Sequence, residues 1–444
     1  MIKNYVMLDI NAFKNFEYMR LIHKLQFALL FFIAQYAIAQ KATIPDFTKA
    51  EMSKDRLALV EEYIEENIAA GVIPGGTFYI ARKGEVVLDK AFGKKTETDD
   101  FVRGDIFRIA SMTKALTTVA ILQLYEQGKL KLDDPVHKYL PAFKNMTVLD
   151  TFNEVDSTFA VKPAENVITL RHLLTHTSGI YYGLFEEAKY RKVYKYFEID
   201  QLGIYHPEMT TLEMADAIAK APLKHEPGTQ WTYGLSMDVL GAVIEKITKR
   251  KLSLIFLTEI FYPLGMHDAH FYLPEAKYDK LAPLFTYDAD GKLIHSPDPT
   301  VDYPIFLNKG HYAGGGGVSC TARDYGRFLQ ALLNDGEYNG KRILSKSSIE
   351  LMRTEQIAHL NKTGNGMSPI PGMSFCLGSA LITQEGEMLG PFSAGTYSWG
   401  GYFNSKWWVD PKEEILFVGM TNVLPFPHSD FWDKLYAIIY AAVE

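Results

Sequence analysis

Apolar positions at helical spacing mark two stretches of this chain, one early and one late. In the early stretch, residues 53–70, Leu57, Val60 and Ile64 share one side of an otherwise acidic segment. The late stretch runs from residue 430 to about 443 and is amphipathic in the same way. Apolar residues that recur every three to four positions predict a helix with one buried face. The sequence therefore predicts a helix over each stretch.

Short stretches with strand character lie between those two helices. They are residues 77–82, 85–91, 375–383, 405–410 and 415–421. Lys83 and Gly84 separate the first two stretches, as a two-residue turn separates the strands of a hairpin. Residues 411–414 separate the last two stretches and also predict a turn.

The middle of the chain, residues 131–309, has a different pattern. It combines short helical segments with prolines and tyrosines and shows no strand-like alternation of any length. We therefore expect residues 40–130 and 310–444 to form one α/β lobe, with residues 131–309 inserted as a mainly helical lobe. Because clefts usually form between lobes, a functional site is expected where the two meet.

Ser111 and Lys114 form the most informative local pattern. An apolar helix is predicted from residue 111 onward, and Gly128 ends it. Three residues on a helix correspond to about 300°, so the two side chains share one face about one turn apart. A lysine at that position can take the proton of a serine and activate a weak nucleophile. An N-cap serine followed by a solvated lysine would show the same pattern.

Tyr233 is the candidate for passing the proton to the leaving atom. It lies in the turn 227–236, ahead of a helix that carries Val239 and Leu240. A tyrosine on such a turn can point its hydroxyl group into a cleft. A core tyrosine with a satisfied hydroxyl group is the alternative interpretation.

An acyl oxyanion also needs backbone N–H donors. The N–H group of Ser111 is one candidate. The second is the N–H group of Tyr402, which follows the stretch Trp399-Gly400-Gly401. Glycines there would let the backbone and a substrate approach closely, and the stretch is expected at the start of a strand.

Composition narrows the class of partner. Of the 444 residues, 47% are hydrophobic and 22% are charged, as in an ordinary globular protein. The net charge of −7 and the absence of a basic run argue against nucleic acid as a partner. We expect a small-molecule substrate instead.

The first residues have the pattern of a targeting segment. Basic residues precede the apolar run 27–34, and Ala37 and Ala39 offer a small-x-small cleavage site. The apolar run is short for a transmembrane helix. We predict a signal peptide over residues 1–39, with residues 1–18 as a candidate extension from an upstream start. A periplasmic or secreted protein without a stable membrane anchor after cleavage would result.

Motifs for metals, cofactors and disulfides are weak or missing. Cys320 and Cys376 are one distant pair, which favours free thiols. His172 and His176 are close in sequence, but no acidic cluster completes a metal site, so a structural role is expected. The sequence holds no P-loop, dinucleotide fingerprint, His-Glu-x-x-His or Gly-x-Ser-x-Gly motif. We therefore predict neither a metal nor a cofactor.

The motifs Ser111-x-x-Lys114, Tyr233 and Trp399-Gly400-Gly401 resemble the three motifs of one superfamily, which holds the serine β-lactamases, penicillin-binding proteins and family VIII carboxylesterases. Further stretches similar to its class C β-lactamase branch are residues 73–76, 171–179, 263–266 and 314–319. The resemblance covers about residues 50–443. It implies an α+β fold in which an antiparallel sheet is flanked by terminal helices and an all-helical lobe is inserted.

Two positions depart from the β-lactamases of that branch. Leu235 stands where they have the asparagine of Tyr-x-Asn, and Trp399 stands where they have the lysine of Lys-Thr-Gly. Loss of that cation removes a charge-assisted contact of roughly 1.5–3 kcal/mol with a β-lactam. Leu235 with Trp399, Gly400 and Gly401 looks like the substrate-binding set of the esterase branch, whose acyl pocket is more apolar.

A literal Lys362-Thr363-Gly364 also occurs. Its neighbours indicate a loop, and no strand is predicted to begin there. Trp399-Gly400-Gly401 leads into the predicted strand 405–410 and lies at the distance from the C-terminus that the resemblance implies. We therefore take Trp399 and not Lys362 as the start of the third motif.

The resemblance implies a serine hydrolase that cleaves carboxylic esters through an acyl-enzyme on Ser111. Lys114 and Tyr233 would act as the acid-base pair, and which of them is the general base stays open. A D-amino-acid peptidase or β-lactamase acting on cell-wall-like amides is one alternative. A non-catalytic penicillin-binding-like module is the other.

Overall fold

The computed structural model describes residues 45–444, apart from residues 200–202, 205, 207, 298–302, 306–309, 365 and 368–370. The predicted signal peptide, residues 1–39, lies outside the described residues. None of the described helices combines the length with the apolar character that a membrane span requires.

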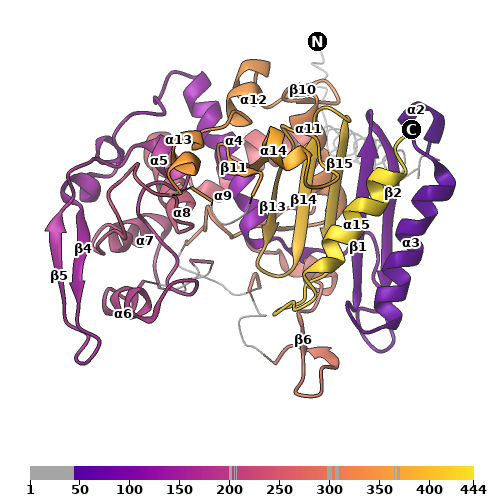
Figure 1. Cartoon of the computed structure of the whole chain (residues 1–444), viewed down its shortest axis with the longest axis horizontal. Coiled ribbons are helices and arrows are strands. Elements are labelled where there is room, and N and C mark those ends of the chain that lie inside the picture. Colours follow the sequence, from indigo (N-terminus) through magenta and orange to yellow (C-terminus); the bar gives the residue numbers. More distant parts are fainter. Residues whose placement is uncertain are drawn as a thin grey trace, which may run out of the picture. The chain divides into compact units, whose positions relative to one another are not determined.

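A seven-stranded antiparallel sheet forms the centre of the fold (Figure 1). Its strands in spatial order are β11 (Met373–Phe375), β12 (Ala380–Ile382), β13 (Tyr397–Gly401), β14 (Ser405–Asp410), β15 (Ile415–Met420), β1 (Gly75–Arg82) and β2 (Glu85–Gly93). Thr77 of β1 pairs with Met420 of β15. Strands from early and late parts of the chain therefore lie side by side in one sheet.

The predicted hairpin at Lys83 and Gly84 is confirmed. The two residues have φ angles of 51° and 77°, the left-handed conformation that a two-residue hairpin turn requires at both positions. The strand predicted over 405–410 has the observed bounds of β14, and the turn 411–414 leads into β15.

Two long helices cover one face of the sheet, which we call the outer face. They are α3 (Lys54–Ala69) and α15 (Asp430–Ala441), as the two amphipathic stretches predicted. Their apolar sides, with Leu57 and Ile439 among them, bury Trp408 and Phe417 of the sheet. The opposite, inner face packs against α11 (Ala322–Leu333).

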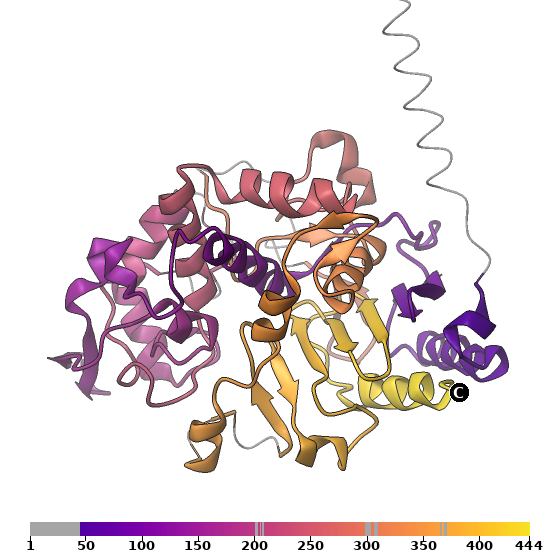
Figure 2. The same ribbon diagram turned by 90° about the horizontal axis from the view of Figure 1, so that it is seen from above.

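The remaining helices are α2 (Phe47–Ala50), α4 (Thr113–Glu126), α5 (Leu170–Leu174), α6 (Ala188–Tyr196), α7 (Thr211–Ile218), α8 (Ser236–Thr248), α9 (Leu252–Phe256), α10 (Tyr262–Leu264), α12 (Lys346–Met352), α13 (Ala358–Lys362) and α14 (Gln384–Glu387). Five short helical segments are η1 (Ala110–Met112), η2 (Val136–Lys138), η3 (Pro141–Asn145), η4 (Leu257–Phe261) and η5 (Glu275–Lys280). Figure 2 shows α4 between the magenta helices of the middle segment and the sheet. The helix that follows Ser111 is thus central to the fold.

The described residues also form four small two-stranded sheets. They pair β3 (Phe107–Arg108) with β8 (Ser319–Cys320), β4 (Thr147–Phe152) with β5 (Phe159–Pro163), β6 (Phe285–Tyr287) with β7 (Leu293–His295), and β9 (Glu337–Tyr338) with β10 (Lys341–Arg342). The hairpins β4–β5 and β6–β7 lie in the middle segment, where no strands were predicted. β5 is exposed along most of its length, so it lacks the alternation of apolar residues that reveals a half-buried strand.

The single strand predicted over 375–383 is wrong. β11 ends at Phe375 and β12 begins at Ala380, with a tight turn between them. Gly378 has a φ of 77° in this turn, and the N–H group of Cys376 donates to the carbonyl oxygen of Ser379 at 2.9 Å. The apolar residues around the turn mimic a continuous strand, but the glycine reverses the chain.

Candidate active site

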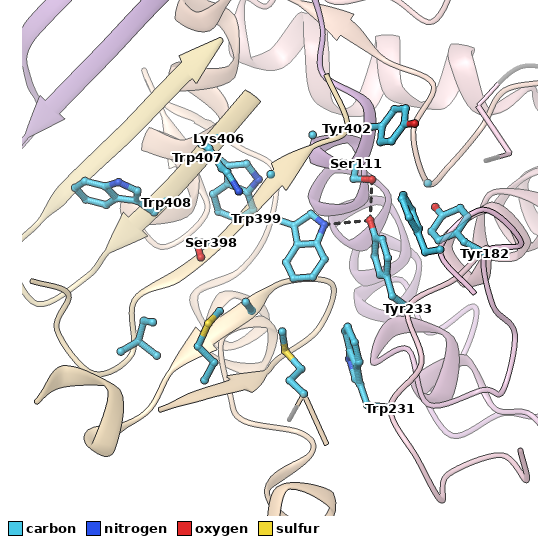
Figure 3. Close-up of a pocket in the computed structure, with 18 of the residues that line it drawn as sticks. Ser111, Tyr182, Trp231, Tyr233, Ser398, Trp399, Tyr402, Lys406, Trp407 and Trp408 are labelled. Atoms are coloured by element: carbon cyan, nitrogen blue, oxygen red, sulfur yellow. Dashed lines mark hydrogen bonds between the residues drawn. The ribbon is translucent and has the colours of Figure 1, made fainter. Parts of the chain in front are cut away.

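Ser111 lies on η1, the helical turn that leads into α4 (Figure 3). The preceding residue, Ala110, has a φ of 40°, a left-handed conformation that is unfavourable for a residue with a side chain. α4 is buried along nearly its whole length. A rigid helix therefore holds Ser111 in place, with backbone strain one residue away.

Lys114 lies fully buried one turn after Ser111. Its ammonium group donates to Ser111 Oγ at 2.9 Å, to the hydroxyl oxygen of Tyr182 at 3.1 Å and to the carbonyl oxygen of Gly315 at 2.6 Å. These three acceptors match the three hydrogens of a charged lysine. No carboxylate of the described residues forms an ion pair with it.

Tyr233 approaches Ser111 from the turn before α8. Its hydroxyl group donates to Ser111 Oγ at 2.7 Å, and Lys114 Nζ lies 4.8 Å from the centre of its ring. The indole N–H group of Trp399 donates to the Tyr233 oxygen at 3.2 Å (Figure 3). An indole can only donate, so this contact directs the hydroxyl hydrogen of Tyr233 away from Trp399.

His176 packs against the ring of Tyr233. Its ring is fully buried, lies 4.9 Å from the Tyr233 ring, and accepts from the N–H group of Gly234 at its Nδ1 atom, 3.4 Å away. Burial, and secondly the charge of Lys114, hold the pKa of His176 well below its usual range. His176 is therefore a neutral packing residue. His172 lies apart from the cleft, in the capping box of α5.

The stretch Trp399-Gly400-Gly401 forms the end of β13, and not the start of a strand as predicted. The strand at 405–410 follows only after a turn. A Cβ atom on Gly401 would lie 2.4 Å from the carbonyl oxygen of Ile109, so the glycine lets β13 pack against η1. Tyr402 then follows directly after this contact, near the turn that carries Ser111.

A cavity of about 700 Å³ opens in front of Ser111. Its wall beyond Tyr233 is apolar and contains Trp231, Met367, Met373, Ala380 and Ile382. Trp399 lies between this wall and the nucleophile. The site can therefore bind a hydrophobic group next to the Ser111 hydroxyl group.

Leu235, which was predicted to bind substrate, and Lys362, which was rejected as the start of the third motif, both lie outside the cavity. Leu235 is fully buried at the start of α8 and does not line the cavity. Lys362 is the last residue of α13, exposed to solvent, and is also outside the cavity wall. The structure therefore brings Ser111, Lys114, Tyr233 and Trp399 together without either of them.

Tyr182 and Gly315 are the contacts that sequence reasoning missed. They lie 68 and 201 residues from Lys114 along the chain, so no local spacing connects them with it. Gly315 lies in the four-glycine run 314–317, which was singled out only as a stretch of resemblance. The glycine run was the sequence feature that could have indicated a backbone segment close to the site.

The remaining reactive side chains do not add a metal site. Cys320 and Cys376 are free and buried, and burial raises the pKa of Cys376 to about 12. Among the residues that the structure describes, no group of three His, Cys, Asp or Glu side chains could hold a metal ion. The predicted free thiols agree with this structure.

Known proteins share this architecture. The family profile described as Beta-lactamase matches residues 60–441. An uncharacterized protein of Mycobacterium tuberculosis is 31% identical over 373 residues, which cover 82% of this chain and 89% of that protein. Esterase EstB of Burkholderia gladioli is 31% identical over 362 residues, 78% of this chain and 86% of EstB. The solved structure of EstCE1, "a hydrolase with promiscuous acyltransferase activity", is 27% identical with a TM-score of 0.73 and covers 87% of this chain and 99% of its own.

Proposed function

The chain belongs to the β-lactamase family and is a serine hydrolase, and we propose that it is exported and cleaves small carboxylic esters. The observation that carries this proposal is the contact between Trp399 and Tyr233. Where the β-lactamases have a cation, this protein has an indole that donates to the candidate acid-base group. The cleft is thereby suited to uncharged acyl groups beside Ser111.

Acylation begins when Ser111 Oγ attacks the ester carbonyl carbon. Lys114 and Tyr233 both lie within 3 Å of Oγ. Whichever of the two is deprotonated accepts the Oγ proton, and the pair then returns a proton to the oxygen of the leaving alcohol. The N–H groups of Ser111 and Tyr402 would donate to the oxyanion. Water then attacks the acyl-enzyme through the same groups in reverse and releases the acid.

The apolar wall supports ester and not β-lactam substrates. Trp231, Met367 and Met373 offer contacts to an acyl chain and no charge to hold a carboxylate beside Tyr233. Among the described residues that line the cavity, the one lysine is Lys406 of β14, which lies on the other side of β13 from Tyr233. Lys114 does not line the cavity, and its amine is bonded to Ser111, Tyr182 and Gly315. A β-lactam would lose its usual ionic partner here.

The test is hydrolysis of 4-nitrophenyl butyrate and nitrocefin, side by side, by the wild type and Ser111→Ala. We expect wild-type turnover of the ester, negligible cleavage of nitrocefin, and at least about a thousandfold loss of kcat in the variant. The melting temperature of Ser111→Ala should match that of the wild type. Retained ester turnover in a folded Ser111→Ala protein would remove Ser111 from the mechanism.

The alternatives give different results in the same assay. Cleavage of nitrocefin or of D-alanyl peptides, but not of the ester, would favour the amide-cleaving alternative. No turnover together with no labelling by a fluorophosphonate would favour the non-catalytic module. Export is tested separately, by the mass of the protein recovered from the periplasm or medium, which should lack residues 1–39.

A further inference from the structure

The cleft does not end at Ser111 but continues around the edge of β13. β12 pairs with β13 only at Tyr397 and Ser398, so on that edge the described residues provide no strand beside Trp399, Gly400 or Gly401, whereas β14 pairs with all three on the other edge. This edge is open, and the cavity is lined by residues from both faces of the sheet. Figure 3 shows Ser398 and Trp408 on the opposite side of β13 from Ser111.

The part of the cavity on the outer face, which we call the outer compartment, has aromatic walls. It is lined by Phe392, Ser398, Lys406, Trp408, Asp433 and Tyr436. The ring of Phe392 lies 5.6 Å from that of Trp408 and 5.3 Å from that of Tyr436. Phe392 and residues of β13, β14 and α15 thus enclose a space with aromatic walls that contains one ammonium group, that of Lys406, and one carboxylate group, that of Asp433.

The lack of a side chain at Gly400 makes room for the side chain of Lys406. It pairs with Gly400 across the ladder, and a Cβ atom on Gly400 would lie 3.0 Å from Lys406 Nζ. With no side chain at Gly400, the ammonium group can lie over the open edge of β13. Gly400 is adjacent to Gly401, which packs against the turn of Ser111, so the compartment is continuous with the nucleophile's side of the cleft.

The ammonium group of Lys406 has no partner among the described residues. It makes no hydrogen bond and no ion pair with them, although Asp433 is close enough to favour its charge. Burial lowers the pKa of Lys406. Lys406 is partly exposed at the mouth of this compartment, so its ammonium hydrogens stay available to a ligand that enters it. A bound anion would supply the missing partner.

We propose that the outer compartment binds a carboxylate group of the substrate through Lys406. The preferred substrates are then esters that carry a free acid, such as half-esters of dicarboxylic acids, with the apolar part of the chain against Phe392, Trp408 and Tyr436. This inference rests on the proposed esterase function, because it places the acid group relative to the ester that Ser111 attacks. It also provides a cation at a different site from the one that Trp399 replaces.

The experiment compares esters with and without a carboxylate. Mono-4-nitrophenyl glutarate carries the acid on the acyl side, 4-(butyryloxy)benzoate carries it on the alcohol side, and 4-nitrophenyl butyrate is neutral. The measured quantity is the ratio of kcat/KM for each acidic ester to that of the neutral ester. In Lys406→Met we expect this ratio to fall roughly ten- to a hundredfold for at least one acidic ester.

Two further variants separate charge from structure. Lys406→Arg keeps the positive charge and should retain most of the preference. Lys434→Met removes an exposed lysine of α15 that pairs with Asp430 outside the cavity, and should leave the ratio unchanged. An unchanged ratio in Lys406→Met for both acidic esters, or an equal fall in Lys434→Met, would overturn the proposal.

Binding distinguishes failure of the compartment from failure of the esterase proposal. Titration of monomethyl glutarate into Ser111→Ala, followed by calorimetry, reads the anion site without turnover. Binding that is lost in the double variant with Lys406→Met would support the compartment even if no ester were cleaved. Absence of binding in Ser111→Ala, with ester turnover intact in the wild type, would refute the compartment alone.

Discussion

The two faces of β13 differ in whether their polar side chains have hydrogen-bond partners within the protein. On the inner face, Trp399, Tyr233, Ser111 and Lys114 form one continuous set of hydrogen bonds, each between 2.7 and 3.2 Å. On the outer face, Lys406 has no such partner among the described residues and lies against aromatic rings. Both faces belong to one cavity.

The difference is what the two proposed roles, proton transfer on the inner face and substrate recognition on the outer face, would require. Groups that move a proton must be held at fixed distances from one another before the substrate arrives, so the inner face is saturated with internal bonds. A group that recognises a substrate charge must keep its bonding capacity for the substrate. An unpaired ammonium group is consistent with that second role, and its cost in stability is the expected consequence.

Gly401→Ala should have a larger effect on the protein than Trp399→Phe or Lys406→Met. The added Cβ atom would lie 2.4 Å from the Ile109 carbonyl oxygen, so β13 must move away from the turn of Ser111. We expect kcat/KM to fall about a hundredfold or more for neutral and acidic esters alike, as when an oxyanion donor is displaced. Gly390→Ala, where a Cβ atom meets nothing within 4 Å, is the matched control. A loss confined to acidic esters would contradict this assignment.

Trp399→Phe should have an intermediate effect, confined to the inner face. It removes the N–H donor to Tyr233 and keeps an aromatic ring, so we expect kcat to fall about tenfold. Trp231→Phe is the control, because Trp231 lines the same cavity but its buried N–H group has no hydrogen-bond partner among the described residues. Trp231→Phe should change KM more than kcat. Equal losses of kcat in the two variants would show that the Trp399 hydrogen bond has no special role.

Lys406→Met should have the smallest effect, and it should be stabilising. Lys406 is a base whose pKa is lowered by burial, so the unfolded chain binds its proton more tightly than the folded protein does. The resulting cost shrinks as the pH rises from the lowered folded-state pKa towards the ordinary value of 10.5, and it disappears above that value. We expect the variant to gain about 1 kcal/mol in the free energy of unfolding at pH 7.5.

Urea unfolding of wild type and Lys406→Met at pH 7.5 and pH 10 checks this prediction. The gain should be larger at pH 7.5 than at pH 10. A variant that is less stable than the wild type at both pH values would indicate that Lys406 holds the outer face together, and would weaken the contrast between the two faces.

Much of the fold was predictable from local pattern. The helices α3 and α15, the hairpin at Lys83 and the strands β14 and β15 follow from spacing and turn residues. The errors lie where local pattern is ambiguous. The turn at Gly378 interrupts an apolar run, and the exposed strands of the middle segment bury too little to show alternation.

The residues of the site also fall into those that the sequence predicts and those that it does not. The one-turn spacing of Ser111 and Lys114 is a property of the helix that follows them, so the sequence alone predicts that they are neighbours. Motif resemblance adds Tyr233 and Trp399. The structure places the Tyr233 hydroxyl group 2.7 Å from Ser111 Oγ, and it also shows a contact that was not predicted, from the Trp399 indole N–H group to the Tyr233 oxygen at 3.2 Å. The role of Tyr182 could not be predicted, because its contact with Lys114 depends on how distant segments pack.

Local sequence was therefore enough to predict the periodic elements, the closeness of Ser111 and Lys114, and the family motifs. Only the tertiary structure decided that Gly315 receives a hydrogen bond from Lys114 and that Leu235 is buried in the core. It alone placed Lys406 over Gly400 at an open strand edge. The reason is physical: spacing along one element fixes which side chains share a face, whereas contacts between elements depend on sheet order, register and packing, which no local pattern contains.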